Sequence, residues 1–279
     1  MRHRAGRLEI WDSRLHRDQV HLRRRNKRGA CLNIQSGAVL GQFLLGRFLE
    51  FSLATPDIQA SLEFYLGLGF TSAEVGDAYS HPYAVVTDGR ICLGLHQEAM
   101  PAPSLTFVKP DLLKHLDRLE SRGVEFEFRR LGNDVFNEVG WFDPSGQLVR
   151  LIEARTFSPS KRLANDTSRC GYFLEIAMPA PDRELAKSYW EDFGFVGMDE
   201  PQDHLPHISC TSDFIDVGLY HPADLRRATL RFEVDDVGGT LAHLADKGIV
   251  PNGEMPPGLR SLPAAVLMAP EGTPILLTS

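Results

Sequence analysis

The sequence predicts an α+β protein built from four copies of a βαβββ module, arranged as two halves in tandem. Two observations predict this class. The segment 48–57 reappears as 173–182, an offset of 125 residues, and similar segments recur along most of the chain. Within each copy, apolar residues first alternate as in a strand and then recur at helical spacing. At 279 residues, 43% of them hydrophobic, the chain is long enough for two ordinary globular domains.

The repeat carries most of the prediction. Phe48-Leu-Glu-Phe-Ser-Leu-Ala-Thr-Pro-Asp57 becomes Phe173-Leu-Glu-Ile-Ala-Met-Pro-Ala-Pro-Asp182. Gly69-Phe70 becomes Gly194-Phe195, and Asp143-Pro-Ser-Gly146 becomes Ala269-Pro-Glu-Gly272. The offset changes by a single residue between such matches, at positions where loops are expected. The two halves therefore descend from one duplicated unit.

Each module can be followed in order. The first has a strand at 48–53, a helix that Asp57 caps and Gly67 or Gly69 ends, and strands at 83–87 and 91–96 around an Asp-Gly turn. The second has a strand at 105–108, a helix that Asp111 caps and Gly123 closes, and strands at 124–130, 136–142 and 147–153. The second half repeats this plan, although Gly238 and Gly239 each weaken the fourth helix by about 1 kcal/mol relative to alanine.

The expected boundaries follow composition. Residues 1–46 form a basic N-terminal extension, 47–155 the first domain of two modules, 156–170 a polar linker and 171–279 the second domain. The extension holds ten Lys/Arg and three Asp/Glu, a net charge of +7, which leaves −14 on the rest. We expect the extension to be disordered; a nucleic-acid-binding arm and non-native upstream sequence are the alternatives.

Charge and composition also exclude several classes of function. The acidic body disfavours nucleic acid or an anionic membrane as the main partner. The chain has no apolar run long enough to span a membrane and no apolar core of a secretory signal. No two of its cysteines form a CxxC pair, which favours free thiols in a reducing compartment: Cys31, Cys92, Cys170 and Cys210. We therefore expect a cytoplasmic protein.

A βαβββ module used four times, with an Asp-started helix, a Gly-Phe helix end and a D-P-x-G turn before the last strand, resembles the vicinal oxygen chelate superfamily. This superfamily contains glyoxalases, bleomycin-resistance proteins and dioxygenases. The resemblance covers 47–155 and 171–279. It implies that two modules pair into a curved sheet around a cup, so that this chain forms two glyoxalase-like cups in tandem. In the family's enzymes, residues from the first and last strands of each module hold a divalent metal in the cup.

Counting along the strands places different residues at those metal positions here. The first cup offers Glu50, Gly94, Ser104 and Arg150, and the second offers Glu175, Gly218, Thr229 and Leu276. Arginine stays protonated and has no acceptor, so it cannot bind a cation. A non-haem iron dioxygenase needs two histidines and one carboxylate at an open site, and neither cup supplies them. We therefore expect no metal and no other cofactor.

Glu50 is the leading candidate residue. It lies in an otherwise apolar strand and faces the cup by alternation, so it is expected to be an acid, a base or a ligand anchor. The alternative is a structural ion pair with Arg150, because a buried carboxylate needs a partner. His96 could add a proton-transfer group beside Glu50. Glu175 is the repeat copy of Glu50, with Arg231 as its candidate partner and Tyr220 in the place of His96.

The predicted function is binding of a small, cationic organic molecule without a metal, as in bleomycin-resistance proteins. A metal-dependent glyoxalase-type lyase or isomerase with Glu50 as base, a dioxygenase, and a non-catalytic interaction module are the alternatives. His81, His204 and His207 lie near the starts of the modules' second strands, and His204 and His207 are expected to be exposed residues of a Pro-bearing loop rather than metal ligands. A monomer is expected, with a homodimer as the alternative. The predicted binding residues are Glu50, His96, Thr106, Arg150, Glu175, Tyr220 and Arg231.

Overall fold

The computed structural model describes residues 44–73, 79–101, 103–132, 137–154 and 168–279. The predicted N-terminal extension and linker lie almost wholly outside these residues, as does Cys31, and the domain boundaries at 46, 155 and 171 stay predictions. Cys92, Cys170 and Cys210 are free thiols. No helix among the described residues is long and apolar enough to cross a membrane.

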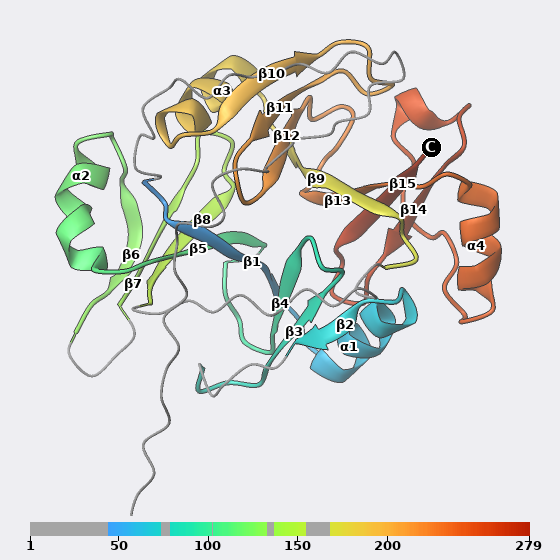
Figure 1. Ribbon diagram of the computed structural model, residues 1–279, viewed down its shortest axis with the longest axis horizontal. Coiled ribbons are helices and arrows are strands. Elements are labelled where there is room, and N and C mark those ends of the chain that lie inside the picture. The colour runs from blue at the N-terminus through green and yellow to red at the C-terminus, as the bar shows by residue number, and fades with distance from the viewer. Residues whose placement is uncertain (1–43, 74–78, 102, 133–136, 155–167) are drawn as a thin grey trace, which may run out of the picture. The chain divides into compact units, whose positions relative to one another are not determined.

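The first half folds into one mixed sheet, whose eight described strands run in the order β2-β3-β4-β1-β5-β8-β7-β6 (Figure 1). Its first module contains β1 (Arg47–Ala54), α1 (Ile58–Gly67), β2 (Thr71–Ala73), β3 (Tyr83–Thr87) and β4 (Cys92–His96). Its second contains β5 (Ser104–Lys109), the 3-10 helix η1 (Leu112–His115), α2 (Leu116–Glu120), β6 (Phe126–Arg130), β7 (Glu138–Phe142) and β8 (Leu148–Glu153).

The second half repeats this order in a seven-stranded sheet, β10-β11-β12-β9-β13-β15-β14. Its elements are β9 (Tyr172–Pro179), α3 (Arg183–Asp192), β10 (Val196–Glu200), β11 (His207–Thr211), β12 (Asp216–Tyr220), β13 (Thr229–Glu233), α4 (Val237–Ala245), η2 (Pro257–Leu259), β14 (Ala264–Met268) and β15 (Pro274–Thr278). The predicted α+β class with two modules per sheet is confirmed. The fourth module, which is fully described, has two strands after its helix where the others have three.

The local signals explain most of these elements. The carboxylate of Asp57 accepts hydrogen bonds from the backbone N–H groups of Gln59 and Ala60, so it caps α1 as predicted. The prediction for Asp111 is wrong, because its backbone is left-handed, with φ of 54°, and its side chain makes no cap hydrogen bond. The chain there forms one 3-10 turn before the five-residue helix α2. Tight 3-10 turns are common at the ends of helices.

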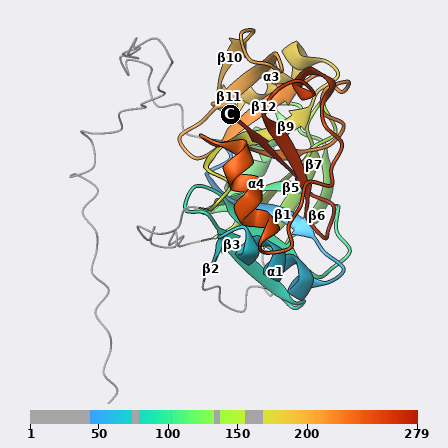
Figure 2. The same cartoon turned by 90° about the vertical axis from the view of Figure 1, so that its right-hand side faces the viewer.

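Each half packs its first helix against the other half. From α1, the Tyr65 hydroxyl donates to Glu271 in the turn between β14 and β15, at 2.6 Å. Both views place α1 beside these second-half strands (Figures 1 and 2). In the reverse direction, the indole of Trp141 on β7 donates to the Tyr189 hydroxyl on α3, also at 2.6 Å. Apolar residues from both sheets accordingly form one continuous core.

The turn that follows β7 contains a buried acid. One oxygen of Asp143 accepts hydrogen bonds from the backbone N–H groups of Ser145 and Gln147, both at 2.8 Å. Its other oxygen is buried without a hydrogen bond of good geometry, near Trp190. Burial raises the pKa of Asp143 to about 6, although the backbone hydrogen bonds oppose this rise. The equivalent residue of the second half is Ala269, so the turn does not require an acid.

Asp143→Asn should therefore remove one step from the pH dependence of stability. The folded protein holds this proton more tightly than the unfolded chain does, so the stabilisation is complete below the unfolded pKa and is lost as pH rises through about 6. A pKa that differs by one between the folded and unfolded states corresponds to about 1.4 kcal/mol. Urea unfolding between pH 4 and 7 should show a smaller decline for the variant than for the wild type. The exposed Asp117→Asn should follow the wild type, and identical profiles for all three proteins would contradict the prediction.

Candidate functional site

The central strands of the first sheet bring a set of polar side chains to one face. Along β1, Phe51 and Leu53 enter the core, whereas Glu50 and Ser52 lie on the opposite face. Across the sheet, Glu50 pairs with Thr106 of β5, and Thr106 pairs with Arg150 of β8. Three of the predicted first-half residues, Glu50, Thr106 and Arg150, therefore share a row.

The carboxylate of Glu50 is buried and fully hydrogen-bonded. Its Oε1 accepts from the Ser52 hydroxyl at 2.7 Å and lies 2.9 Å from Nε2 of His96, and its Oε2 accepts from the Tyr83 hydroxyl. Ser52 also contacts the Thr106 hydroxyl at 2.7 Å. We call these five residues, Glu50, Ser52, Tyr83, His96 and Thr106, the Glu50 cluster. Burial and the charge of Glu50 raise the pKa of Tyr83 far above its ordinary value, so its hydroxyl stays a donor.

The alternative given for Glu50, an ion pair with Arg150, does not form in the structure. Among the described residues, Arg150 instead binds Glu138 of β7, donating from Nε at 2.7 Å and from Nη2 to the same oxygen. The register explains the difference, because Thr106 lies between Glu50 and Arg150, whereas Glu138 is diagonal to Arg150 across the β7–β8 pair. The Nη1 group of Arg150 is buried and has no hydrogen-bond partner within the part of the chain that the structure describes.

A row of hydrogen bonds leads from the Glu50 cluster to the surface. Nδ1 of His96 lies 2.9 Å from Nε2 of His81, and Nδ1 of His81 lies 2.8 Å from a carboxylate oxygen of Glu98. Only 13% of the His81 side chain is exposed. Burial lowers the pKa of His81, and Glu98 opposes this shift. The pairing of Tyr83 with His96 could have located His81, which lies two residues earlier on the adjoining segment.

The second sheet holds a related group, which we call the Glu175 cluster: Glu175, Asp203, His207, Tyr220 and Arg231. Tyr220 donates to Glu175 at 2.5 Å, and Nη1 of Arg231 lies 3.4 Å from the same oxygen, as expected for its partner. Arg231 also donates to Asp203 at 2.7 Å. His207 lies 3.3 Å from Glu175 and is buried, so the expectation that it is exposed is wrong.

The two clusters exchange a histidine and a tyrosine between neighbouring strands. Tyr83 on β3 pairs with His96 on β4, whereas on the equivalent strands β11 and β12 the rings of His207 and Tyr220 stack, with centroids 4.4 Å apart. Burial alone would lower the pKa of His207, but its hydrogen bond to Glu175 and the charge of that residue outweigh burial and raise it. Each buried glutamate is thus in contact with one histidine and one tyrosine.

The donor sets do not fit the metal that the fold family implies. A Cβ added to Gly94 would collide with the carboxylate of Glu50, and one on Gly218 with that of Glu175, so these carboxylates fill the space of last-strand ligands. Both ring nitrogens of His96 are engaged by Glu50 and His81. No group of three metal-ligating side chains converges among the described residues.

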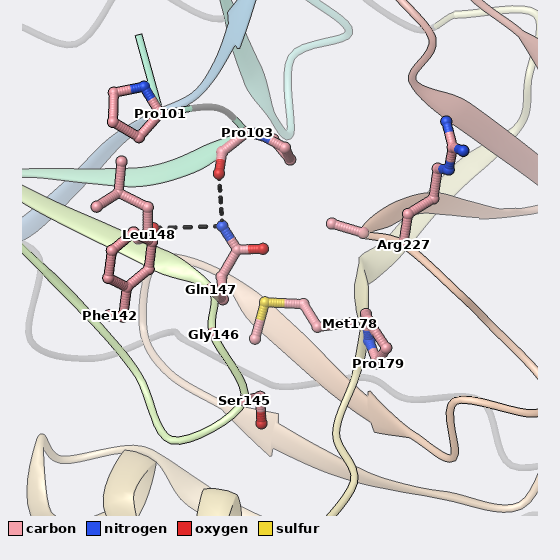
Figure 3. A pocket seen from close by; sticks show the side chains of 11 residues that line it. Pro101, Pro103, Phe142, Ser145, Gly146, Gln147, Leu148, Met178, Pro179 and Arg227 are labelled. Carbon is pink, nitrogen blue, oxygen red and sulfur yellow. Dashed lines mark hydrogen bonds between the residues drawn. The ribbon is translucent and has the colours of Figure 1, made fainter.

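A cavity of about 270 Å³ lies elsewhere, between the first-half turn after β7 and the start of β13. Figure 3 shows Phe142 and Leu148 on one side, Arg227 on the other, and Gln147 between them. Gln147 donates to the carbonyl oxygens of Pro103 and Leu148. This cavity contains none of the predicted binding residues, so we do not place the site there.

Residues 47–151 match the model of the Glyoxalase/Bleomycin resistance protein/Dioxygenase superfamily. The match lies within the first half of the chain, and the second half repeats the same topology. The resemblance to vicinal oxygen chelate proteins is thereby confirmed. No curated protein matches the chain.

Several solved structures share the fold. A mutant of homoprotocatechuate 2,3-dioxygenase from Brevibacterium fuscum is 16% identical, with a TM-score of 0.56 over 84% of this chain and 71% of that one. The 2,3-dioxygenase LapB from Pseudomonas sp. KL28 is 14% identical, with a TM-score of 0.54 over 83% and 91%. BphC, a halotolerant catechol dioxygenase, is 14% identical, with a TM-score of 0.53 over 84% and 87%. At these identities the likeness shows the fold alone.

Proposed function

We propose that this protein binds a small organic molecule at the polar face of its first sheet, without a metal at the family's ligand positions. The observation that carries the proposal is the buried, unpaired Nη1 group of Arg150. Only 6% of the Arg150 side chain is exposed, and its other donors bind Glu138. A buried donor without an acceptor costs about 1–3 kcal/mol, so a bound oxygen atom would remove a real penalty.

The same observation changes the expected ligand. Glu50 already accepts three hydrogen bonds in the Glu50 cluster, so it does not require a cationic ligand. The unsatisfied group is a donor, which favours a ligand with a carboxylate or carbonyl oxygen. Tyr79 lies beside Arg150: burial and the charge of Glu50 raise the pKa of Tyr79, and the charge of Arg150 and a hydrogen bond with it oppose this rise. Because Nη1 itself has no hydrogen-bond partner among the described residues, we infer that an oxygen atom of the ligand is its acceptor.

The alternatives receive less support. A dioxygenase is favoured by the names of the matched structures, and a lyase or isomerase by the family, but both need a metal that the donor sets do not fit. In a purely structural module, no acceptor would compensate for the burial of the Arg150 Nη1 group. The expectations of a cytoplasmic location, a monomer and no nucleic-acid partner stay predictions.

Arg150→Lys should separate ligand binding from folding. Lysine keeps a positive charge beside Glu138 but loses the second N–H group that would reach the ligand. We would follow thermal unfolding with homoprotocatechuate, catechol and benzoate as probes. A bound probe at about 100 times its dissociation constant adds about 2.7 kcal/mol of stability. The variant should bind about 1.5–3 kcal/mol more weakly, as expected for a hydrogen bond to a charged group.

The matched control makes the same change in the other half. Arg231→Lys should retain the stabilisation by the probe, since Arg231 lies on the second sheet. The proposal would be overturned if no probe stabilised the wild type, or if Arg150→Lys bound as tightly as the wild type. Stoichiometric metal in the purified protein that disappears in Glu50→Gln would instead establish the metal-dependent alternative.

A further inference from the structure

We propose that Glu98, His81 and His96 form a proton path to Glu50, which makes the first polar face an acid–base site for its ligand. This inference rests on the proposed function, because it describes what the same face does to the molecule that it binds. The second polar face lacks such a path among its described residues.

The path has three links of similar length. Glu98 and His81 are joined at 2.8 Å, His81 and His96 at 2.9 Å, and His96 and Glu50 at 2.9 Å. Side-chain exposure falls along the same order, from 49% at Glu98 through 13% at His81 to 0% at His96 and 1% at Glu50. The row therefore connects water with a carboxylate that water does not reach.

Protons balance along this row without any other reactant. In one state His81 is an imidazolium ion that donates to Glu98 and His96, and His96 donates from Nε2 to the Glu50 carboxylate. Two protons then move inward, from Nε2 of His81 to Nδ1 of His96 and from Nε2 of His96 to Oε1 of Glu50. The second state holds a neutral Glu50 and two neutral histidines, and the total charge of the row is unchanged.

Aromatic side chains enclose the middle of the path. The Tyr83 ring lies 4.6 Å from that of His96, and the Tyr79 ring lies 4.9 Å from His96 and 5.0 Å from His81. Because these rings pack against the imidazoles, the hydrogen-bonded ring nitrogens of His81 and His96 form the connection to Glu50. Because the Tyr83 hydroxyl occupies Oε2, the exchanging proton has Oε1 as its site.

The second half provides an internal comparison. His207 also faces a buried glutamate, Glu175, but its Nδ1 lies 2.9 Å from the backbone carbonyl oxygen of Leu205. A carbonyl oxygen accepts a hydrogen bond and cannot pass a proton onward. Nδ1 of His207 must therefore carry its hydrogen permanently, and the second row ends there.

Nitrogen NMR of histidine-labelled protein tests the path without any ligand. The wild-type protein would be titrated while the ring nitrogens of His81, His96 and His207 are followed. The groups that face His81 are Glu98, His96 and Arg150. We expect the hydrogen of His96 to be distributed between Nε2 and Nδ1 as the two states exchange, with a change that follows the protonation of His81, and we expect this response to be lost in His81→Gln. Nδ1 of His207 should stay protonated throughout in both proteins.

A second variant guards against a folding defect. Glu98 is half exposed, so Glu98→Gln should fold normally, and loss of its charge should move the midpoint of His81 to lower pH. The proposal is overturned if the hydrogen of His96 stays on one ring nitrogen throughout the titration of His81, or if the His96 response survives in His81→Gln. Because no ligand is present, this result stands apart from the Arg150→Lys binding experiment.

Discussion

Replacing Arg231 with leucine is expected to lower the free energy of unfolding by about 3–5 kcal/mol, the usual cost of leaving buried charge without its partner. Arg231 on β13 binds Glu175, Tyr220 and Asp203, and 8% of its side chain is exposed. Its loss would leave Glu175, 3% exposed, with His207 as its remaining positive neighbour. Urea unfolding at neutral pH would measure the change as a lower midpoint.

The control is the same substitution at a nearby exposed arginine. Arg226 pairs with Glu254 at 3.4 Å, but both side chains are largely exposed, so Arg226→Leu should cost at most about 1 kcal/mol. Equal decreases in the free energy of unfolding of the two variants would mean that Arg231 is not needed to balance the charges of Glu175 and Asp203. The charge of His207 alone would then balance that of the buried Glu175 carboxylate.

The topology could be predicted from sequence because each element of one half has a matching segment in the other, so the two segments support the same assignment. The Asp-capped helix after β1 and the same helix after β9 start from matching segments, and both caps form. Where the halves differ, the prediction was weaker. Asp111 resembles a cap in sequence, yet its left-handed backbone points the side chain away from the helix N–H groups. A propensity for capping does not fix the backbone angle on which capping depends.

The candidate site was predictable in part. Alternation placed Glu50, Thr106 and Arg150 on one face, and the structure brings them into one row. Choosing the partner of Arg150 needed the register of a third strand. The turn at 143–146 fixes that register and makes Glu138, twelve residues earlier, a diagonal neighbour. The signal was therefore present, but it required counting back through the turn.

The exchange between histidine and tyrosine was harder to predict. Comparing β4 with β12 shows that Tyr220 replaces His96, which suggests that the second half lost a histidine. Comparing β3 with β11 shows that His207 replaces Tyr83. Because each residue lies opposite the other across a strand pair, the two changes compensate in space. Aligning either strand alone hides this relation.

Trp141→Ala is expected to lower the free energy of unfolding by about 3–5 kcal/mol, because truncating a fully buried tryptophan leaves a large cavity. The side chain is 1% exposed, stacks on Phe193 at 6.3 Å and meets Phe126 edge-on at 5.8 Å. Phe193 belongs to the second half and Phe126 to the first, so the cavity would open between them. Thermal and urea unfolding would both report the loss.

The neighbouring residue supplies the control, since Phe142 follows Trp141 on β7 but is 46% exposed. Phe142→Ala should therefore cost well under about 1.5 kcal/mol. Tyr189→Phe isolates the polar part of the contact, because it leaves the Trp141 indole N–H buried and unpaired, at about 1–3 kcal/mol. Unfolding should remain a single transition in every variant, because Tyr65 and Glu271 still join the halves from the opposite side. Two separate transitions in Trp141→Ala would show instead that this tryptophan alone couples them.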